Sequence, residues 1–479
     1  MAIPTSTVKI PAAMTAVARP LALDVWALRR PHCQPSHIEK NRHLGAMSRK
    51  DSGRHKALAL FFIFFFALHA ISQTEPSYVS GASYAGASQL MQLVPQLQGQ
   101  RVAIVAHAAS LSLDPRKKQL VHTVDRAVKL KLNVVKIFSP EHGFTGSFSA
   151  GEHIEGQEVE GLDIPMVSLY GSHKKPTLED LSDVDVVLFD LQDVGVRFYT
   201  YISTLSYVME ACAEQGKSLI VLDRPNPFSD VVDGPVLDTA YSSFVGMHPV
   251  PVLYGLTMGE YARMVAGEGW IAHAESLTLS ILPCLDYHRQ PAMLAVPPSP
   301  NLPNAHAIAL YPSLCFFEAT PVSVGRGTDA PFERFGAPWM DHLGDAFVPS
   351  ANEGARSPKF EGQTCFGQDL RSTSFVPEQG LDLDFLHQVY HAYVGKGMDS
   401  IAPFFTSFMD KLAGGPSLED ALTAGASVEA IKDSWQEGLD AYRQKREAYL
   451  LYPRLPEPSS PVMPAPETPA RKKPKKKAP

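Results

Sequence analysis

Short apolar runs separated by polar turns dominate the middle of the chain, and such runs predict buried strands. The runs lie at 102–106, 134–138, 166–169, 186–189 and 219–222. Two segments between them, 118–132 and 201–213, carry apolar residues at helical spacing, and Gly216 is the expected end of the second helix. Alternating strands and helices predict an α/β fold with a doubly wound, mainly parallel sheet.

The pattern changes after Gly255, where helices and irregular segments replace the regular alternation. Residues 257–265 predict a helix, with Thr257 as its N-cap and Glu260 three residues later. A strand-like segment at 277–281 and a Pro-rich loop follow, and helical patterns dominate from 382 to 452. We therefore expect a first domain at 93–256 and a smaller α+β domain at 257–455, preceded by a linker at 73–92.

An apolar run near the N-terminus, 57–68, predicts a secretory signal peptide. Basic residues precede it, and small residues come before a possible cleavage site after Ser72. Since the run begins late, we expect Met47 to be the true start and residues 1–46 to be an upstream extension. The alternative is a genuine extension that leaves the run as a membrane anchor. Either way, the protein is expected to be exported, to the periplasm or beyond the cell. The Pro-rich, basic residues 456–479 are expected to be a disordered tail.

Composition and motifs exclude several classes of function. A formal net charge of −7 over 479 residues argues against a dedicated nucleic-acid binder. No nucleotide-binding glycine motif or HExxH motif occurs, so neither a cofactor nor a metal is expected. The five cysteines have no zinc-like spacing and are expected to be buried thiols, with one disulfide as the alternative in an exported protein. The pattern predicts no stable protein partner and leaves the oligomeric state open.

Three of the predicted strands end in polar clusters. The clusters contain Glu141, His142, Asp190, Asp193, Asp223, Arg224 and Asn226. In open α/β sheets, ligands bind outside the carboxyl ends of the strands, so the clusters predict one shared binding site. Glu141 is a candidate general acid, because partial burial of a carboxyl group raises its pKa. The alternative is that Glu141 caps a helix or forms a salt bridge.

The second and third clusters suggest how a sugar acid is recognised. If residues 196–201 are extended, Arg197, Tyr199 and Tyr201 share one face. An arginine can grip a carboxylate with two hydrogen bonds, and tyrosines can stack on a sugar. The alternative is an Asp–Arg pair that stabilises the loop. A glycine-containing polar loop near Glu318 and Arg326 is either the second wall of a cleft or an ordinary surface loop.

Several long strings resemble the DUF1343 family, which is described as exo-β-N-acetylmuramidases of the NamZ type. They include SPEHGF at 139–144, LFDLQDVGVRFYTYIST at 188–204, VLDRPNP at 221–227 and LYPSLCFFEATPVSVGRGT at 310–328. The resemblance extends from about residue 93 to residue 452. It implies a glycoside hydrolase that releases N-acetylmuramic acid from the non-reducing end of peptidoglycan fragments. It also implies a Rossmann-like domain and a smaller domain with the active site in the cleft between them, and Glu141 as the catalytic residue.

The resemblance leaves two questions open. The family usually has an asparagine and a threonine after the first strand, where this chain has His107-Ala108-Ala109. The alternative function is therefore a muropeptide-binding or sensing protein with weak catalysis. The second catalytic group is Asp190, Asp193, Glu318 or the 2-acetamido group of the substrate, because glycosidases need a group that stabilises or attacks the oxocarbenium-like centre.

Overall fold

The computed structural model describes residues 79–80, 84–114, 117–141, 143–144, 163–294, 296–341 and 344–454. These residues belong to one compact unit. The expected signal peptide, the start at Met47, His142 and the basic tail lie outside the described residues. Within the described ranges, no helix combines the length and apolar character needed to cross a membrane.

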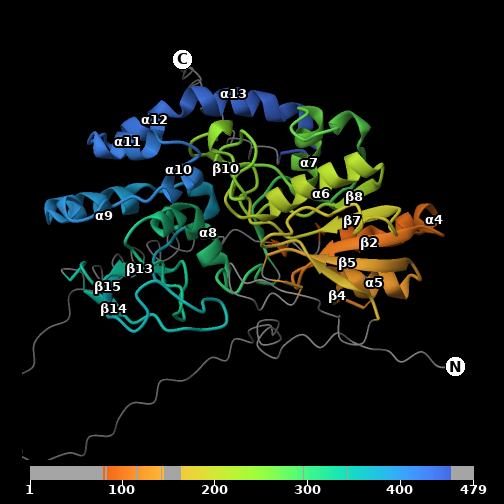
Figure 1. The fold of residues 1–479 in the computed structure, drawn as a ribbon, viewed down its shortest axis with the longest axis horizontal. Coiled ribbons are helices and arrows are strands. Elements are labelled where there is room, and N and C mark those ends of the chain that lie inside the picture. Colours follow the sequence, from red (N-terminus) through yellow and green to blue (C-terminus); the bar gives the residue numbers. More distant parts are fainter. Residues whose placement is uncertain are drawn as a thin grey trace, which may run out of the picture. The chain divides into compact units, whose positions relative to one another are not determined.

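A six-stranded parallel sheet forms the centre of the first part of the chain (Figure 1). Its strand order is β11-β8-β7-β2-β5-β6. The strands are β2 (Arg101–Ala106), β5 (Asn133–Ser139), β6 (Met166–Ser168), β7 (Val186–Asp190), β8 (Ser218–Leu222) and β11 (Thr278–Leu282). All pairings within it are parallel, which confirms the predicted sheet. β11 joins the sheet although it follows residue 256, where the sequence suggested that the first domain ends.

Helices α5 (Thr123–Lys129), α6 (Tyr201–Gln215) and α7 (Met258–Gly267) belong to this part. Gly216 ends α6 with a φ of 60°, as predicted. The predicted capping box of Thr257 and Glu260 is present at the start of α7. The helix expected at 118–132 was partly wrong, because 119–122 forms β4 and pairs with β3. The helix begins only after His122, whose ring accepts the Val124 N–H.

Residues 84–97, most of which were expected to be a linker, pack closely against the sheet. They form η2 (Gly86–Leu93) and α4 (Val94–Leu97), and Leu90 is fully buried. The N–H of Gly86 donates to Asp223 O at 2.8 Å. A Cβ at Gly86 would lie 2.2 Å from Leu282 O, so only glycine permits this approach. The sheet therefore has an additional covering segment before β2.

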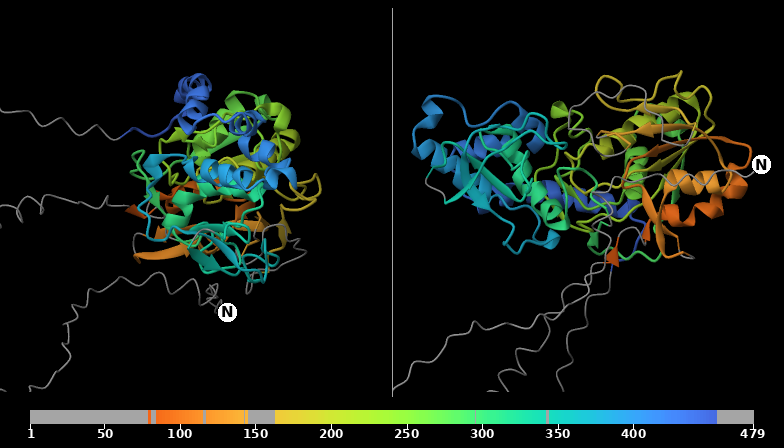
Figure 2. Two further views of the ribbon diagram at one scale, coloured as in Figure 1. Left: turned by 90° about the vertical axis from the view of Figure 1, so that its left-hand side faces the viewer. Right: turned by 90° about the horizontal axis from the view of Figure 1, so that it is seen from below.

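The second part of the chain contains a small antiparallel sheet and a series of helices (Figure 2). The sheet has the order β13-β15-β14. Its strands are β13 (Arg334–Ala337), β14 (Asp345–Phe347) and β15 (Cys365–Asp369). The helices are α8 (Ala305–Leu314), α9 (Asp384–Gly395), α10 (Phe408–Ala413), α11 (Ser417–Thr423), α12 (Val428–Ser434) and α13 (Gln436–Arg446), with η5 (Cys315–Ala319) directly after α8. This composition confirms the expected smaller α+β part.

The remaining elements are short. Three two-stranded pairs combine β1 (Val79–Ser80) with β12 (Ala292–Met293), β3 (Leu111–Asp114) with β4 (Gln119–His122), and β9 (Val232–Asp233) with β10 (Leu253–Tyr254). Single 3₁₀ turns are η3 (Thr239–Tyr241), η4 (Ala274–Ser276), η6 (Pro377–Gln379), η7 (Met398–Ser400) and η8 (Glu447–Tyr449). Cysteines 212, 284, 315 and 365 are buried free thiols, as predicted for those four.

Candidate active site

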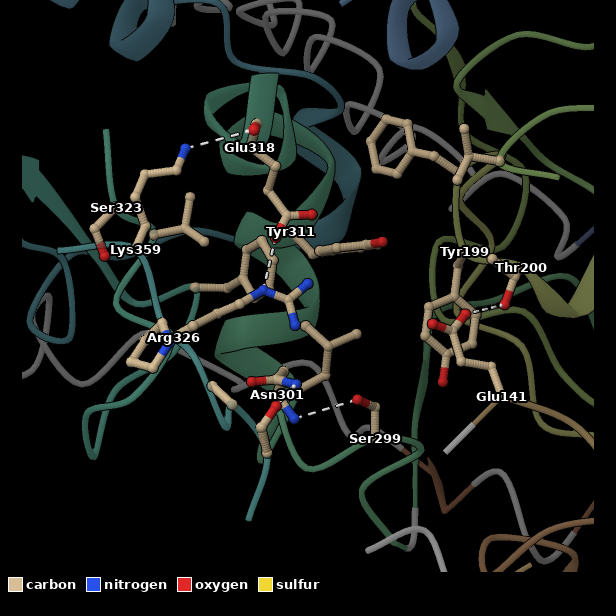
Figure 3. Close-up of a pocket in the computed structure, with 18 of the residues that line it drawn as sticks. Glu141, Tyr199, Thr200, Ser299, Asn301, Tyr311, Glu318, Ser323, Arg326 and Lys359 are labelled. Carbon is tan, nitrogen blue, oxygen red and sulfur yellow. Dashed lines mark hydrogen bonds and ion pairs between the residues drawn. The ribbon is translucent and has the colours of Figure 1, made fainter. Parts of the chain in front are cut away.

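A cavity of about 740 Å³ is lined by residues from both parts of the chain. In Figure 3, Glu141 lies across the cavity from Glu318 and Arg326. Among the described lining residues the charged ones are Glu141, Glu318, Arg326, Arg356 and Lys359. Aromatic rings supply much of the remaining surface, from Tyr170, Tyr199, Tyr201, Phe244, Tyr311 and Phe332. A cavity with aromatic walls and a few charged side chains is suited to a sugar, whose ring faces are apolar and whose hydroxyls need hydrogen bonds.

Glu141 comes from the loop that follows β5, and its side chain is half-buried. Its Oε2 accepts a hydrogen bond of 2.8 Å from the Thr200 hydroxyl (Figure 3). Thr200 is the N-cap residue of α6, so a helix end holds the donor in place. The bond fixes one carboxyl oxygen and leaves Oε1 as the oxygen that can transfer a proton.

Tyr199 and Tyr201 form the aromatic wall beside Glu141, with ring centroids 4.7 Å apart. The Tyr199 hydroxyl donates to Pro298 O at 3.1 Å, and the Tyr201 hydroxyl lies 3.4 Å from Glu141 O. Burial raises the pKa of both phenols, so both remain neutral hydrogen-bonding groups. Two of the three residues expected on one face therefore reach the cavity.

His107 lies behind this wall and is buried outside the cavity lining. Its Nε2 accepts the Gln192 N–H at 3.1 Å, which leaves the ring proton on Nδ1. Nδ1 is 3.1 Å from the Tyr201 hydroxyl oxygen and so donates to it. His107 thus orients Tyr201 from the side away from the cavity. The histidine at this position, where the family usually differs, therefore affects the cavity through the Tyr201 side chain.

Glu318 and Arg326 form the opposite wall, as the second-wall interpretation of their loop predicted. Arg326 Nε donates to Glu318 Oε1 at 2.6 Å, and its guanidinium stacks over Phe332 at 5.1 Å from the ring centroid. Glu318 follows α8 in η5, where Cys315 contacts its second carboxyl oxygen at 3.6 Å. Both charged side chains are about a quarter exposed, which keeps them accessible to a ligand.

Lys359 fixes the shape of this second wall. Its ammonium donates to the carbonyl oxygens of Phe317, Glu318, Thr320 and Val322 at distances of 2.5–3.5 Å. All four acceptors belong to the segment that carries Glu318. Burial lowers the pKa of Lys359, while Glu318 acts in the opposite direction. The lysine therefore joins the 354–359 loop, including exposed Arg356, to the backbone around Glu318.

Asp190 and Arg224 lie at the predicted sheet edge, but the structure does not bring them to the cavity. Arg224 binds Asp190 through Nε at 2.7 Å and Nη2 at 2.9 Å, and both side chains are buried. The Thr123 hydroxyl donates to the same carboxylate, and Arg224 Nη1 donates to Leu111 O at 3.0 Å. Both carboxylate oxygens of Asp190 and all three guanidinium nitrogens of Arg224 thus have hydrogen-bond partners within the protein.

Arg197 also points away from the cavity. Residues 197–200 form turns, so the extended conformation assumed for this segment is wrong. The fully buried guanidinium donates to Pro235 O and Val250 O through Nη1, and to Leu412 O through Nη2, at 2.7–2.8 Å. Burial lowers its pKa to about 9. Arg197 therefore connects the two parts of the chain through carbonyl oxygens and has no access to a substrate carboxylate.

The third cluster is likewise internal. Asp223 accepts hydrogen bonds from Gly259 N, the Thr257 hydroxyl and the Tyr452 hydroxyl at 2.5–2.7 Å. Burial raises its pKa to about 6. Asn226 binds Leu256 O, and its Oδ1 would lie 2.0 Å from a Cβ at position 195, which explains Gly195 with a φ of 78°. This cluster anchors α7 and the segment around Tyr452 to the sheet.

Asp193 is buried next to the aromatic wall and does not line the cavity. It accepts the Gly195 N–H at 2.6 Å and the Tyr254 hydroxyl. Burial raises its pKa to about 7, although both donors favour the charged form. Such a carboxyl is neutral at mildly acidic pH while remaining enclosed.

Replacing Asp193 with Asn is expected to flatten the pH dependence of stability. Between its unfolded pKa near 4 and its folded pKa of about 7, the folded protein binds more protons than the unfolded chain. Wild-type stability therefore falls as pH rises through this interval, by at most about 1.4 kcal/mol per pH unit from this group. Urea unfolding at pH 5 and pH 8 measures the difference. An equal pH-induced loss in Asp193→Asn would contradict the assignment.

Sequence reasoning missed several lining residues. Thr200, Ser299, Asn301 and Lys359 line the cavity, yet none was selected. Thr200 stands between the two selected tyrosines, and Ser299 and Asn301 lie in the Pro-rich loop, so adjacency gave a signal for these three. The sequence offered no signal for Lys359, because its role depends on the four carbonyl oxygens that the fold places around its ammonium group. Among the described residues no group of three or more His, Cys, Asp or Glu is arranged to hold a metal ion.

Comparisons with known proteins cover both walls of the cavity. The family models described as exo-beta-N-acetylmuramidase NamZ, N-terminal and C-terminal, match residues 102–306 and 309–452. The peptidoglycan beta-N-acetylmuramidase NamZ of Bacillus subtilis strain 168 is 33% identical over 379 residues, which is 74% of this chain and 88% of that protein. Two solved DUF1343 family proteins of Bacteroides fragilis are 36% and 25% identical, with TM-scores of 0.69 and 0.65. Each match covers 78% of this chain, and 99% and 100% of the respective Bacteroides chains.

Proposed function

The chain belongs to the exo-beta-N-acetylmuramidase NamZ family, and we propose that the cavity beside Glu141 is where it releases N-acetylmuramic acid from peptidoglycan fragments. The enzyme is an exo-acting glycoside hydrolase, and we propose that it acts from the non-reducing end. The observation that carries the assignment of the site is the pairing of Glu141 on one wall with Glu318 on the other. They are the two carboxylates among the described lining residues.

Glu141 is proposed as the general acid. Cleavage requires a proton on the leaving glycosidic oxygen, and a positioned carboxylic acid supplies it. The 2.8 Å bond from Thr200 occupies Oε2 and supports Oε1 as the proton-carrying oxygen. The same carboxylate can then activate water, once the leaving sugar has taken the proton.

The second group is proposed to be Glu318 or the 2-acetamido group of the substrate. Asp190 and Asp193 are less suitable, since both are buried outside the cavity lining. Arg326 donates to Glu318 Oε1 at 2.6 Å and orients this side chain, which as a carboxylate suits a nucleophile, a general base or a stabiliser of positive charge. Catalysis by the 2-acetamido group requires only that the cavity wall hold this group of the substrate close to the anomeric carbon.

The distribution of charge supports one orientation of the substrate. Arg326, Arg356 and Lys359 outnumber the single carboxylate of Glu318 on the second wall, whereas Glu141 is the charged lining residue described on the first. Muramic acid carries a lactyl carboxylate that glucosamine lacks. The cationic wall favours this anion and directs the glycosidic oxygen toward Glu141.

The structure does not support the alternative function, a binding or sensing protein without turnover, at residues 107–109, the segment that suggested it. His107 contacts Tyr201 and Gln192, and none of residues 107–109 lines the cavity. Glu141, to which the family resemblance assigns the catalytic role, lines the first wall beside Tyr199 and Tyr201. Turnover is therefore the function that the cavity favours.

Export is also proposed. The apolar run 57–68, its basic flank and the small residues before Ser72 support a cleaved signal peptide. A mature N-terminus at Gln73, identified by mass spectrometry of the native protein, is the expected result. A native peptide from residues 1–46 would contradict the proposed start at Met47.

The test of the function is sugar release from two matched substrates. A chromogenic N-acetylmuraminide is expected to be cleaved in the presence of a chelator, and the corresponding N-acetylglucosaminide, which lacks the lactyl group, at least tenfold more slowly. A longer peptidoglycan fragment is expected to lose muramic acid one residue at a time from its non-reducing end. Tight binding of the muraminide without release would contradict the proposal and support the binding protein.

A further inference from the structure

Two histidines on α9 lie outside the cavity lining, and a ring nitrogen of one is close to a ring nitrogen of the other. His387 and His391 are four residues apart in the helix, so their side chains share one face. Their ring centroids are 4.3 Å apart, and their Nε2 atoms are separated by 3.1 Å. His391 is exposed and His387 is half-buried, and neither lines the cavity.

The 3.1 Å separation is the distance expected between two ligands of one metal ion. Metal–imidazole bonds are about 2.0–2.1 Å long, so two such ligands at angles between about 90° and 110° are about 2.9–3.4 Å apart. Imidazole nitrogens suit Ni²⁺, Cu²⁺ and Zn²⁺. The distance between the two Nε2 atoms is therefore already in the range that a shared ion requires.

The hydrogen bonding around His387 leaves a place for a cation. Besides His391 Nε2, the carbonyl oxygen of Ala426 lies 3.3 Å from His387 Nε2. In one tautomer of His387 the Nε2 proton is donated to Ala426 O. In the other tautomer the proton is on Nδ1, and the Nε2 lone pair is available to a metal ion. An ion shared with His391 Nε2 therefore competes with a single hydrogen bond.

We propose that His387 and His391 form a binding site for a divalent transition-metal ion, separate from the hydrolytic cavity. The two Nε2 atoms are the protein ligands, and the remaining positions are left to water, because the described residues contain no group of three or more His, Cys, Asp or Glu around one point. Ala426 O, from the loop between α11 and α12, is close enough to receive a hydrogen bond from such a water. The site connects α9 to this loop.

The experiment measures thermal unfolding of the full chain with NiCl₂ added, and again after EDTA. An ion that binds the folded protein and not the separated histidines of the unfolded chain raises the unfolding midpoint. We expect a saturable rise in the wild type that EDTA reverses, and its loss in both His387→Ala and His391→Ala. His288→Ala is the matched control, because His288 is exposed and has no histidine four residues away on either side.

A full rise in His391→Ala, or an equal loss in His288→Ala, would overturn the proposal. His391→Asn provides a second, polar variant that keeps a side chain on the exposed face in case the alanine variant folds poorly. Hydrolysis of the muraminide is expected to be unchanged in all these variants without metal, because neither histidine lines the cavity. Failure of the metal site and failure of the proposed hydrolysis are thus distinguishable.

Discussion

Glu141→Gln is expected to lower kcat for a natural muramyl glycoside by a factor of about 10²–10⁴, the usual contribution of general acid–base catalysis. Glutamine keeps the size of the side chain and can still accept the Thr200 hydrogen bond through its amide oxygen. It cannot transfer a proton to the leaving oxygen. The measurement is initial-rate kinetics on a muramic acid-containing disaccharide, together with thermal unfolding to verify the fold.

The leaving group separates an acid catalyst from a mere binding residue. A nitrophenolate leaves without protonation, whereas a sugar alkoxide does not, so the loss in Glu141→Gln should be much smaller for the chromogenic substrate. Glu318→Gln is the informative comparison. If Glu318 supplies the second carboxylate, an activated leaving group does not restore its activity. If the acetamido group acts, Glu318→Gln keeps most of its activity on both substrates.

Glu179→Gln serves as the matched control, because this glutamate is exposed and does not line the cavity. It should retain wild-type kinetics with either leaving group. Wild-type activity in Glu141→Gln on the disaccharide would refute the assignment. Equal losses with both leaving groups would show that Glu141 contributes by binding or positioning.

The centre of the sheet was predictable because its middle strands are buried on both faces. β7 is buried at all five positions and β2 at five of six, and such strands must be continuous apolar runs. The capping box at Thr257 and the end of α6 at Gly216 were also predicted correctly, since each depends on one or two local residues. The β3–β4 hairpin was missed because residues 119–122 fit a helical spacing, although only four residues separate them from their pairing partner β3.

The site was predictable only in part, because residue type and strand position do not reveal what a polar side chain contacts. Glu141, Asp190 and Asp223 all follow or end strands of one sheet edge. Only Glu141 lines the cavity, while Asp190 is neutralised by an arginine 34 residues later and Asp223 receives donors from α7 and from Tyr452. These partners are fixed by tertiary packing, so a single sequence cannot distinguish a carboxylate in a buried ion pair from one that lines the cavity.

Asp190→Ala is expected to destabilise the protein by about 3–5 kcal/mol, because it leaves the Arg224 guanidinium buried without its counter-charge. The pair is almost fully buried, with side-chain exposures of 0% for Asp190 and 2% for Arg224. The Thr123 hydroxyl also loses its acceptor. Urea unfolding followed by circular dichroism measures the change.

The Arg101–Asp185 pair is a matched control at the other end of β7, where Asp185 directly precedes the strand and Arg101 begins the neighbouring strand β2. It has nearly the same two-point geometry, with bonds of 2.7 and 3.1 Å, but its side chains are 43% and 33% exposed. Water solvates whichever partner remains, so Asp185→Ala should have a much smaller effect. Equal destabilisation by the two variants would contradict the role assigned to burial.

Activity per folded molecule then distinguishes a structural Asp190 from a catalytic one. At low temperature, where Asp190→Ala still contains folded protein, a structural aspartate predicts near wild-type kcat for that fraction. A loss as large as that of Glu141→Gln would instead place Asp190 in the chemistry. Glu141→Gln should keep stability and lose turnover, and Asp190→Ala should do the reverse, because one carboxylate faces the cavity and the other is enclosed by its arginine.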